Sequence, residues 1–229
     1  MRSLPKILRL VAVLGAPLAL GAQAARTDAL SVTLVDGPAV LGRGALRLRT
    51  ERVGTGVDLV ASGIVVRPGG RTTAELRADT TGAVRRYVTE TRDSAGRVID
   101  RVELVAAGGR MVWRRTAVGR RAVREFPAPR GLLLRDDEGL VPLLLAAARA
   151  DSDDSVTVFD VRRGTHARGR PTAAPRTTVS IAEVPLDAAP MTVRGASGVL
   201  LAWWRDARGR LLFAPLDATR AVRRDDPPT

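Results

Sequence analysis

The sequence predicts a mainly β protein: a strongly curved antiparallel sheet, an open or half barrel built as a meander, with one buried apolar helix around residues 140–150. Three observations predict this fold class. Glycine-bearing turns recur at even spacing, the segments between them alternate apolar with polar residues, and one Leu- and Ala-rich segment interrupts the pattern. Alternation with a period of two is typical of strands with one buried face, and a segment that is apolar all round is typical of a buried helix.

The evenly spaced turns begin after residue 67. Glycines at 69, 82, 96 and 109 are spaced by 13, 14 and 13 residues, and two of them close Asp-x-x-Gly turns that start at Asp79 and Asp93. Glycine supplies the positive φ of tight turns, and Asp at the first position accepts a hydrogen bond from the backbone two residues on. Strands of roughly nine residues, about 30 Å long, remain between the turns. Asp79 and Asp93 therefore lie at opposite ends of one strand and are scaffold residues.

The segments around these turns alternate as strands should. In residues 45–51 Leu46 and Leu48 alternate with arginines, and in residues 73–78 alanine and leucine alternate with Thr, Glu and Arg. One face of the sheet is expected to be buried and the other solvated. Long strands of this kind suit a large curved sheet or an open barrel.

The helix is predicted where the alternation stops. Residues 140–150 are rich in Leu and Ala, with Pro142 near the start and Arg149 near the end, positions that suit the two ends of a helix. We expect this helix to pack across the concave face of the sheet. The acidic run at 136–138 before it, and the aspartates of 151–154 after it, are interpreted as solvated turns and not as a catalytic pair or a calcium site.

Strands are predicted again at 156–161, 177–184, 191–194, 199–205 and 211–213. Residues 162–176 are rich in Gly, Pro and Arg, so the sequence predicts an exposed, mobile loop there. The last hairpin turns at residues 206–209, a third Asp-x-x-Gly.

The first 25 residues have the features of a secretory signal peptide. Arg2, Lys6 and Arg9 precede an apolar run at 10–20, and the small residues of 21–25 include an Ala-x-Ala cleavage pattern. The run is too short to span a bilayer, which takes about 20 apolar residues, so we expect no transmembrane segment after signal cleavage. The expected location is periplasmic or secreted.

The remaining chain is expected to fold as one unit. We predict a single antiparallel β domain at 26–217 and a polar C-terminal tail at 218–229. The sequence contains no cysteine, so the stability of an exported chain must come from its core and not from disulfides.

The chain is strongly basic, with 37 Lys and Arg against 24 Asp and Glu, a formal charge of +13. A basic surface attracts anionic partners such as nucleic acid, lipid headgroups or acidic polysaccharide. Only seven residues are aromatic, and no nucleic-acid-binding motif is found, so we expect no nucleic-acid partner. An anionic envelope surface remains an expected partner.

Catalytic and metal-binding patterns are absent from the sequence. His166 is the one histidine, no Gly-x-Ser-x-Gly elbow accompanies it, and no cysteine can join it as a metal ligand. No phosphate loop or dinucleotide fingerprint is found either. The sequence therefore predicts no catalytic residue, no metal site and no cofactor. A hydrolase is the less favoured interpretation, with Asp100 and Asp160 as the acids it would need.

The order of elements resembles a known family. A signal peptide, a meander of long strands, an apolar helix and further strands ending in the hairpin "WWRDARGRLL" (203–212) resemble the periplasmic lipoprotein-carrier (LolA/LolB-like) half-barrels and related uncharacterised envelope proteins. In that family a curved antiparallel sheet wraps a helix and encloses an apolar cavity for acyl chains, with an arginine prominent inside. No single arginine here corresponds to it, and this chain has fewer aromatic residues than an aromatic-lined cavity would use.

The resemblance implies an exported, non-enzymatic binding or carrier protein for an apolar or lipid-like ligand, with lipid or lipoprotein acyl chains as partners. The residues expected to line its cavity are Leu143, Leu144, Ala147, Trp203 and Trp204. Ordinary core packing would account for the same five residues. The alternative function is a structural or interaction protein that contacts anionic envelope surfaces.

Overall fold

The computed structural model describes residues 27–149 and 155–228. The expected signal peptide and the aspartates of 151–154 lie outside the described residues. The first eight strands are β1 (Thr27–Asp36), β2 (Ala39–Val53), β3 (Gly56–Arg67), β4 (Gly70–Asp79), β5 (Val84–Asp93), β6 (Val98–Ala107), β7 (Arg110–Ala117) and β8 (Arg120–Pro127). They are followed by β9 (Leu132–Arg135), α1 (Pro142–Ala148), β10 (Val156–Asp160), β11 (Thr165–Ala173), β12 (Thr177–Ile181), β13 (Val184–Gly195), β14 (Gly198–Arg205), β15 (Leu211–Pro215) and β16 (Arg220–Arg224).

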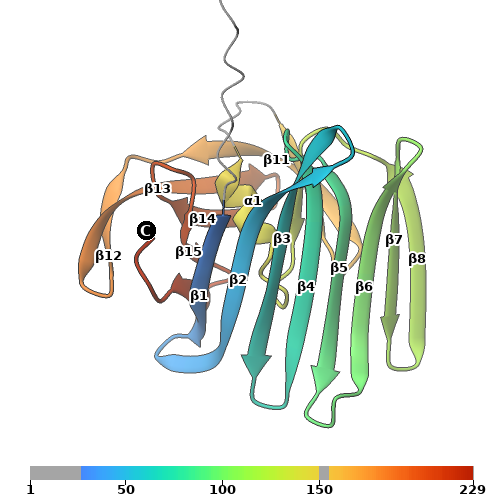
Figure 1. The fold of residues 1–229 in the computed structure, drawn as a ribbon, viewed down its shortest axis with the longest axis horizontal. Coiled ribbons are helices and arrows are strands. Elements are labelled where there is room, and N and C mark those ends of the chain that lie inside the picture. The colour runs from blue at the N-terminus through green and yellow to red at the C-terminus, as the bar shows by residue number, and fades with distance from the viewer. Residues whose placement is uncertain (1–26, 150–154, 229) are drawn as a thin grey trace, which may run out of the picture.

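The described strands form one curved, unclosed sheet, which confirms the predicted fold class. Strands β8 to β1 follow one another as a meander, and the sheet continues from β1 through β16, β15, β14, β13, β11 and β10 to β9. Neighbouring strands are antiparallel except β9 and β10, which are parallel, so the sheet is mixed. Strand β12 pairs with β13 outside this path. Figure 1 shows the meander, with β8 at its free edge.

The Asp-x-x-Gly turns have the predicted geometry. Gly69, Gly82, Gly96 and Gly109 all have positive φ. The carboxylate of Asp79 accepts hydrogen bonds from the backbone N–H groups of residues 81 and 83, at 2.9 and 3.0 Å. Asp93 and Asp206 accept the equivalent bonds in their own turns. Because each aspartate holds a turn, the interpretation of Asp79 and Asp93 as scaffold is confirmed.

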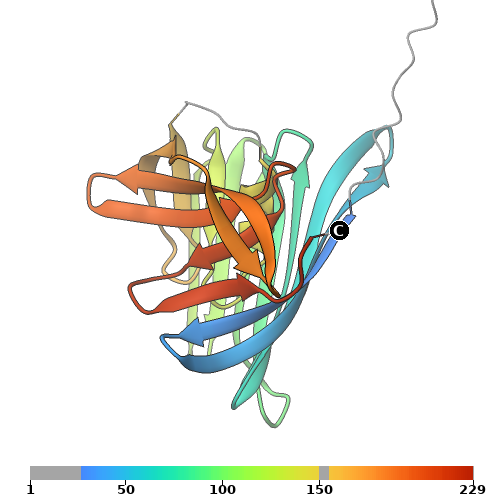
Figure 2. The ribbon, with the colours of Figure 1, turned by 90° about the vertical axis from the view of Figure 1, so that its left-hand side faces the viewer.

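The sheet curves strongly because irregularities interrupt the regular pairing of its strands. The pairing register shifts at five places: between residues 34 and 35, 77 and 78, 91 and 92, 193 and 194, and 204 and 205. A bulge bends its strand and increases the local twist. Figures 1 and 2 show the result: the C-terminal strands β13–β15 run across the direction of the meander strands instead of continuing their plane.

The core fills the inner face of the sheet, defined here as the face that contacts α1. All of α1 except its last residue is buried, and one continuous apolar cluster joins it to residues of β1–β7, β9, β10 and β13–β16. Gly63 on β3 permits this close approach, since a Cβ there would lie 3.1 Å from Cγ2 of Val141 and 2.4 Å from Cδ2 of Leu46. The predicted buried helix is therefore confirmed, within Pro142–Ala148.

Three predictions for the C-terminal half are wrong. The polar tail predicted at 218–229 contains β16, which pairs with β1 and β15 and buries Val222, so the domain does not end at 217. Residues 162–176 are not a long loop, because β11 occupies Thr165–Ala173 and pairs first with β10 and then with β13. Residues 177–184 are not one strand, because Ala182 and Glu183 adopt positive φ and turn the chain between β12 and β13. Strand β11 pairs with β10 across a short turn and with β13 farther along the chain, and this pairing overrides its loop-like composition. The hairpin between β12 and β13 was missed because Ala and Glu are not typical turn residues.

Candidate functional site

The structure gathers four of the five predicted lining residues into the main core. Leu144, Ala147 and Trp203 are almost fully buried, with exposed fractions of 2%, 0% and 4%, and Leu143 lies beside them at 4%. Trp204 is separate. It is half-buried in a small cluster with Ile181, Ala188 and Leu212, and its ring meets Phe213 edge-on with a centroid distance of 5.1 Å.

A pocket of about 390 Å³ lies beside α1. Of the five predicted residues, Leu143 lines it. The other apolar lining residues are Val199, Leu200, Leu201, Ala202, Pro215, Leu216 and Ala218. Pockets that bind small molecules are typically about 300–1,000 Å³ and mostly apolar, with a few polar groups that fix orientation. This pocket fits that description, and it is our candidate functional site.

Charged groups border one side of the pocket. Arg135 donates from Nε and Nη2 to the two carboxylate oxygens of Asp137, each at 3.1 Å, and Nη2 also donates to the carbonyl of Leu216 at 2.9 Å. The hydrogen bond to Asp137 raises the pKa of Arg135, against the effect of burial. Asp217, also on this side, accepts bonds from the backbone N–H groups of residues 220 and 219, which hold its pKa below the ordinary value. The pocket thus combines an apolar wall with a permanently charged border.

Asp136, next to this border, belongs to a buried polar network. Its carboxylate accepts hydrogen bonds from the Tyr87 hydroxyl, from Nε of Arg162 at 2.9 Å and from the backbone N–H of Glu138 at 3.0 Å. Arg162 also donates to Oδ2 of Asp100 at 2.6 Å. Asp100 in turn receives both Nε and Nη2 of Arg115, each at 3.0 Å. The network ties β5, β6 and β7 to the segments after β9 and β10.

Burial and charge shift two pKa values in this network. Burial raises the pKa of Tyr87 well above its ordinary value, and the neighbouring Asp136 carboxylate raises it further. Burial alone would lower the pKa of Arg162, but the charge and hydrogen bond of Asp136 outweigh that effect, so the pKa of Arg162 is raised. Tyr87 therefore stays neutral and Arg162 stays charged.

The network corrects the interpretation of residues 136–138 as a solvated turn. Asp136 is only 4% exposed. Glu138 is ion-paired with Arg67, and Asp137 with Arg135. The three acids together pair with four arginines, because Asp137 also pairs with Arg220. Pairing matters most at Asp136, since an unpaired buried carboxylate would be costly. The sequence did carry one signal for this: an acidic run one residue after the apolar "LLL" at 132–134.

The acids of the hydrolase interpretation have defined partners. Asp100 is shared by Arg115 and Arg162. Asp160 accepts hydrogen bonds from the backbone N–H groups of residues 162 and 163, each at 3.0 Å, in the turn after β10. Both carboxylates hold the fold together at these positions. His166 lies on β11, exposed, with its ring stacked on Phe126 at a centroid distance of 5.7 Å.

Across residues 27–149 and 155–228, no three His, Cys, Asp or Glu side chains are grouped so that they could hold a metal ion. In the same ranges no helix has the length and apolar character needed to cross a membrane.

Comparison with protein families, with curated protein sequences and with solved structures finds no match to this chain.

Proposed function

We propose that this protein is an exported binding or carrier protein for an apolar or lipid-like ligand, held in the pocket beside α1. The observation that carries the proposal is the pocket's wall: eight of its lining residues are apolar, and they come from the helix, from β14, from the end of β15 and from the segment after it. Export is part of the proposal and rests on residues 1–25. The resemblance to the lipoprotein-carrier half-barrels supports the same ligand class.

The pocket's size and border suit an amphipathic ligand. Each methylene moved from water into an apolar site contributes about 0.8 kcal/mol, so a chain of roughly eight carbons would gain about 6 kcal/mol before the cost of ordering it. A polar head group would then lie at the charged border formed by Arg135, Asp137 and Asp217. Leu144, Ala147 and Trp203 belong to the same core cluster as Leu143 and pack behind the wall of the pocket without lining it.

The proposal is tested by blocking the pocket from its exposed side. Ala218 lines the pocket and is exposed, so Ala218→Trp places an indole there without disturbing the core. Ala95→Trp is the matched control, because Ala95 is exposed in the distant turn between β5 and β6. Binding of the uncharged dye N-phenyl-1-naphthylamine is measured by its fluorescence.

We expect the unchanged protein to bind the dye, Ala218→Trp to weaken binding by about tenfold or more, and Ala95→Trp to change it by less than about twofold. Displacement of the dye by a fatty acid then identifies the ligand class. Absence of dye binding, or equal effects of the two tryptophans, would contradict the proposal.

A further inference from the structure

A second hollow, of about 820 Å³, lies between the inner face of the β7–β8 hairpin and the turn after β10. Six of its twelve lining residues are arginines and one is acidic, Asp100. We call it the arginine groove; its arginines are Arg115, Arg120, Arg121, Arg124, Arg162 and Arg163. No comparable excess of one charge lines the pocket beside α1, which has Arg135 against Asp136, Asp137 and Asp217.

The groove exists because the packed residues that cover the inner face of the sheet end partway along β7. Trp113 is the last fully covered residue of that strand: its indole N–H donates to the carbonyl of Val161 at 2.9 Å, and Gly164 packs against its ring. Beyond it, Ala117 and Ala122 present only methyl groups. Small side chains at these positions leave the floor of the groove open.

The arginines of the groove fall into two groups. Arg115 and Arg162 form the inner wall, and their guanidinium groups are held by Asp100 and Asp136. Arg120 forms the outer rim at the start of β8: it pairs with Ala117 and shares the inner face with it, whereas Arg121 pairs with Thr116 and its side chain alternates to the outer face. Within the described chain, no hydrogen bond or ion pair engages the guanidinium group of Arg120. Asp100 and Asp136 balance the charges of this wall, so the groove's excess of positive charge comes from the arginines nearer the rim, and Arg120 supplies donors that are free to bind.

Two more arginines lie near the rim. Arg124 uses Nη1 for the carbonyl of Gly164 at 2.9 Å and stacks over Trp113 at 6.0 Å, which orients the guanidinium group. Arg163 is 80% exposed and is paired only at 3.7 Å, with Asp160. Arg120 and Arg124 are four residues apart on one strand, about 13 Å along it. The row of cations therefore suits a ligand with more than one negative group.

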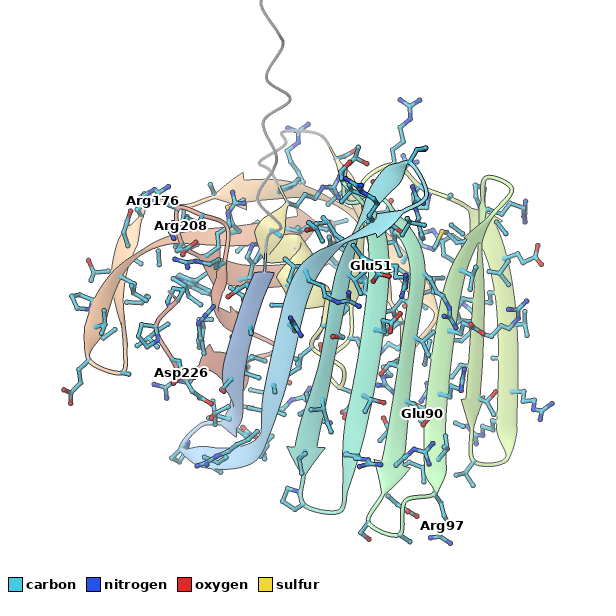
Figure 3. All side chains as sticks on the ribbon, viewed as in Figure 1. Glu51, Glu90, Arg97, Arg176, Arg208 and Asp226 are labelled. Atoms are coloured by element: carbon cyan, nitrogen blue, oxygen red, sulfur yellow. The ribbon has the colours of Figure 1, made fainter. Side chains whose placement is uncertain are left out.

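The outer face of the meander, opposite α1, is arranged differently although it also carries many arginines. Glu90 is ion-paired with Arg92 and Arg101, at 2.7 and 3.3 Å. Glu51 likewise has arginine partners, at 3.0 Å (Arg49) and 3.7 Å (Arg77). Figure 3 shows Glu51 and Glu90 on the face toward the viewer. Because these arginines alternate with glutamates, an anion approaching the outer face meets both signs of charge.

We propose that the arginine groove is a binding site for phosphate groups, and that it takes a ligand bearing two or more of them in a row. Guanidinium groups bind phosphate oxygens through paired, charge-assisted hydrogen bonds, and they remain charged at any physiological pH. Nucleic acid is disfavoured, because Trp113 is buried and no other aromatic residue lines the groove on which a base would stack. The ligand's phosphates can belong to a soluble polyphosphate or to lipid headgroups at a membrane surface. This site is separate from the proposed apolar pocket.

The test removes the free cation of the rim. Arg120→Gln breaks no side-chain hydrogen bond or ion pair of the described structure, so we expect the fold to be retained. The matched control is Arg43→Gln, at an exposed arginine of β2 whose side chain also has no hydrogen bond or ion pair in the described chain. Each variant loses one positive charge. Binding of inorganic tripolyphosphate is measured by calorimetry, and binding to phosphatidylglycerol vesicles by sedimentation.

We expect tripolyphosphate to bind the unchanged protein, with affinity that falls as salt is added. The rim variant should lose about tenfold or more in affinity, and the control less than about twofold. Binding to vesicles with the same variant pattern, but not to tripolyphosphate, would assign the phosphates to lipid headgroups. Equal losses in the two variants, or no binding in either assay, would overturn the proposal.

Discussion

Asp136 shows how one residue fixes the interior of this protein. Its carboxylate is buried and contacts Tyr87, Arg162 and the backbone of Glu138. A buried ion pair contributes little net stability when complete, but removal of one partner leaves a charge without compensation. The position is therefore sensitive to substitution.

We expect Asp136→Asn to lower the free energy of unfolding by about 3 kcal/mol, near the lower end for a broken buried pair because Arg162 keeps Asp100. Glu75→Gln is the control, since it removes one carboxylate from an exposed pair with Arg77 and should cost less than about 1 kcal/mol. Urea unfolding measures both. Similar small losses in the two variants would show that the network contributes no more than a surface pair.

Tyr87 provides a direct test of burial, because it is the one tyrosine in the sequence. Its pKa is raised in the folded protein above the ordinary value of 10.0, so folding favours the neutral phenol. That contribution to stability is fully present below about pH 10 and is lost as the pH rises toward the folded pKa. In alkaline titration, tyrosinate absorbance should therefore appear above pH 10, together with unfolding. In urea the same group should titrate near pH 10. Ionisation near pH 10 in the folded protein would contradict the buried network.

At the scale of the element, local sequence patterns predicted most of the turns and the helix, which are formed by contacts between residues close in sequence. The turns closed by Gly82 and Gly96 and the helix at Pro142–Ala148 are where residue type and periodicity place them. Strand β11 was missed because its own composition is that of a loop, whereas its stability comes from pairing with β10 and β13. The burial of Asp136 was missed for the same reason: its partners are 49 and 26 residues away.

Strand β11 makes a prediction for hydrogen exchange. Its backbone pairs with β10 over Thr165–Gly169 and with β13 over Arg170–Ala173, so the amides that point toward these partners should exchange slowly. The amides of Gly54 and Thr55, exposed in the turn between β2 and β3, are the internal reference for rapid exchange. Uniformly rapid exchange across 165–173 would show that the segment is the loop its composition suggests.

At the scale of the whole molecule, the sequence predicted an open curved sheet but not its strand order. The order depends on β1 meeting β16 and on β9 joining β10 in parallel, pairings that no local pattern specifies. The sheet ends at β8 and β9. Strand β8 is protected from pairing with other chains by its charges and by Pro127, features that commonly protect edge strands. Among the predicted lining residues, only Leu143 reaches the pocket, because Leu144, Ala147 and Trp203 are buried in the main core and Trp204 packs in the separate small cluster.

The central claim, that the pocket beside α1 holds an apolar ligand, is tested most directly by native mass spectrometry of the protein purified from the cells that produce it. We predict an additional bound mass that organic extraction identifies as lipid-like, that is lost in Ala218→Trp and that is retained in Ala95→Trp. A spectrum of the unchanged protein that contains only the bare polypeptide would contradict the claim.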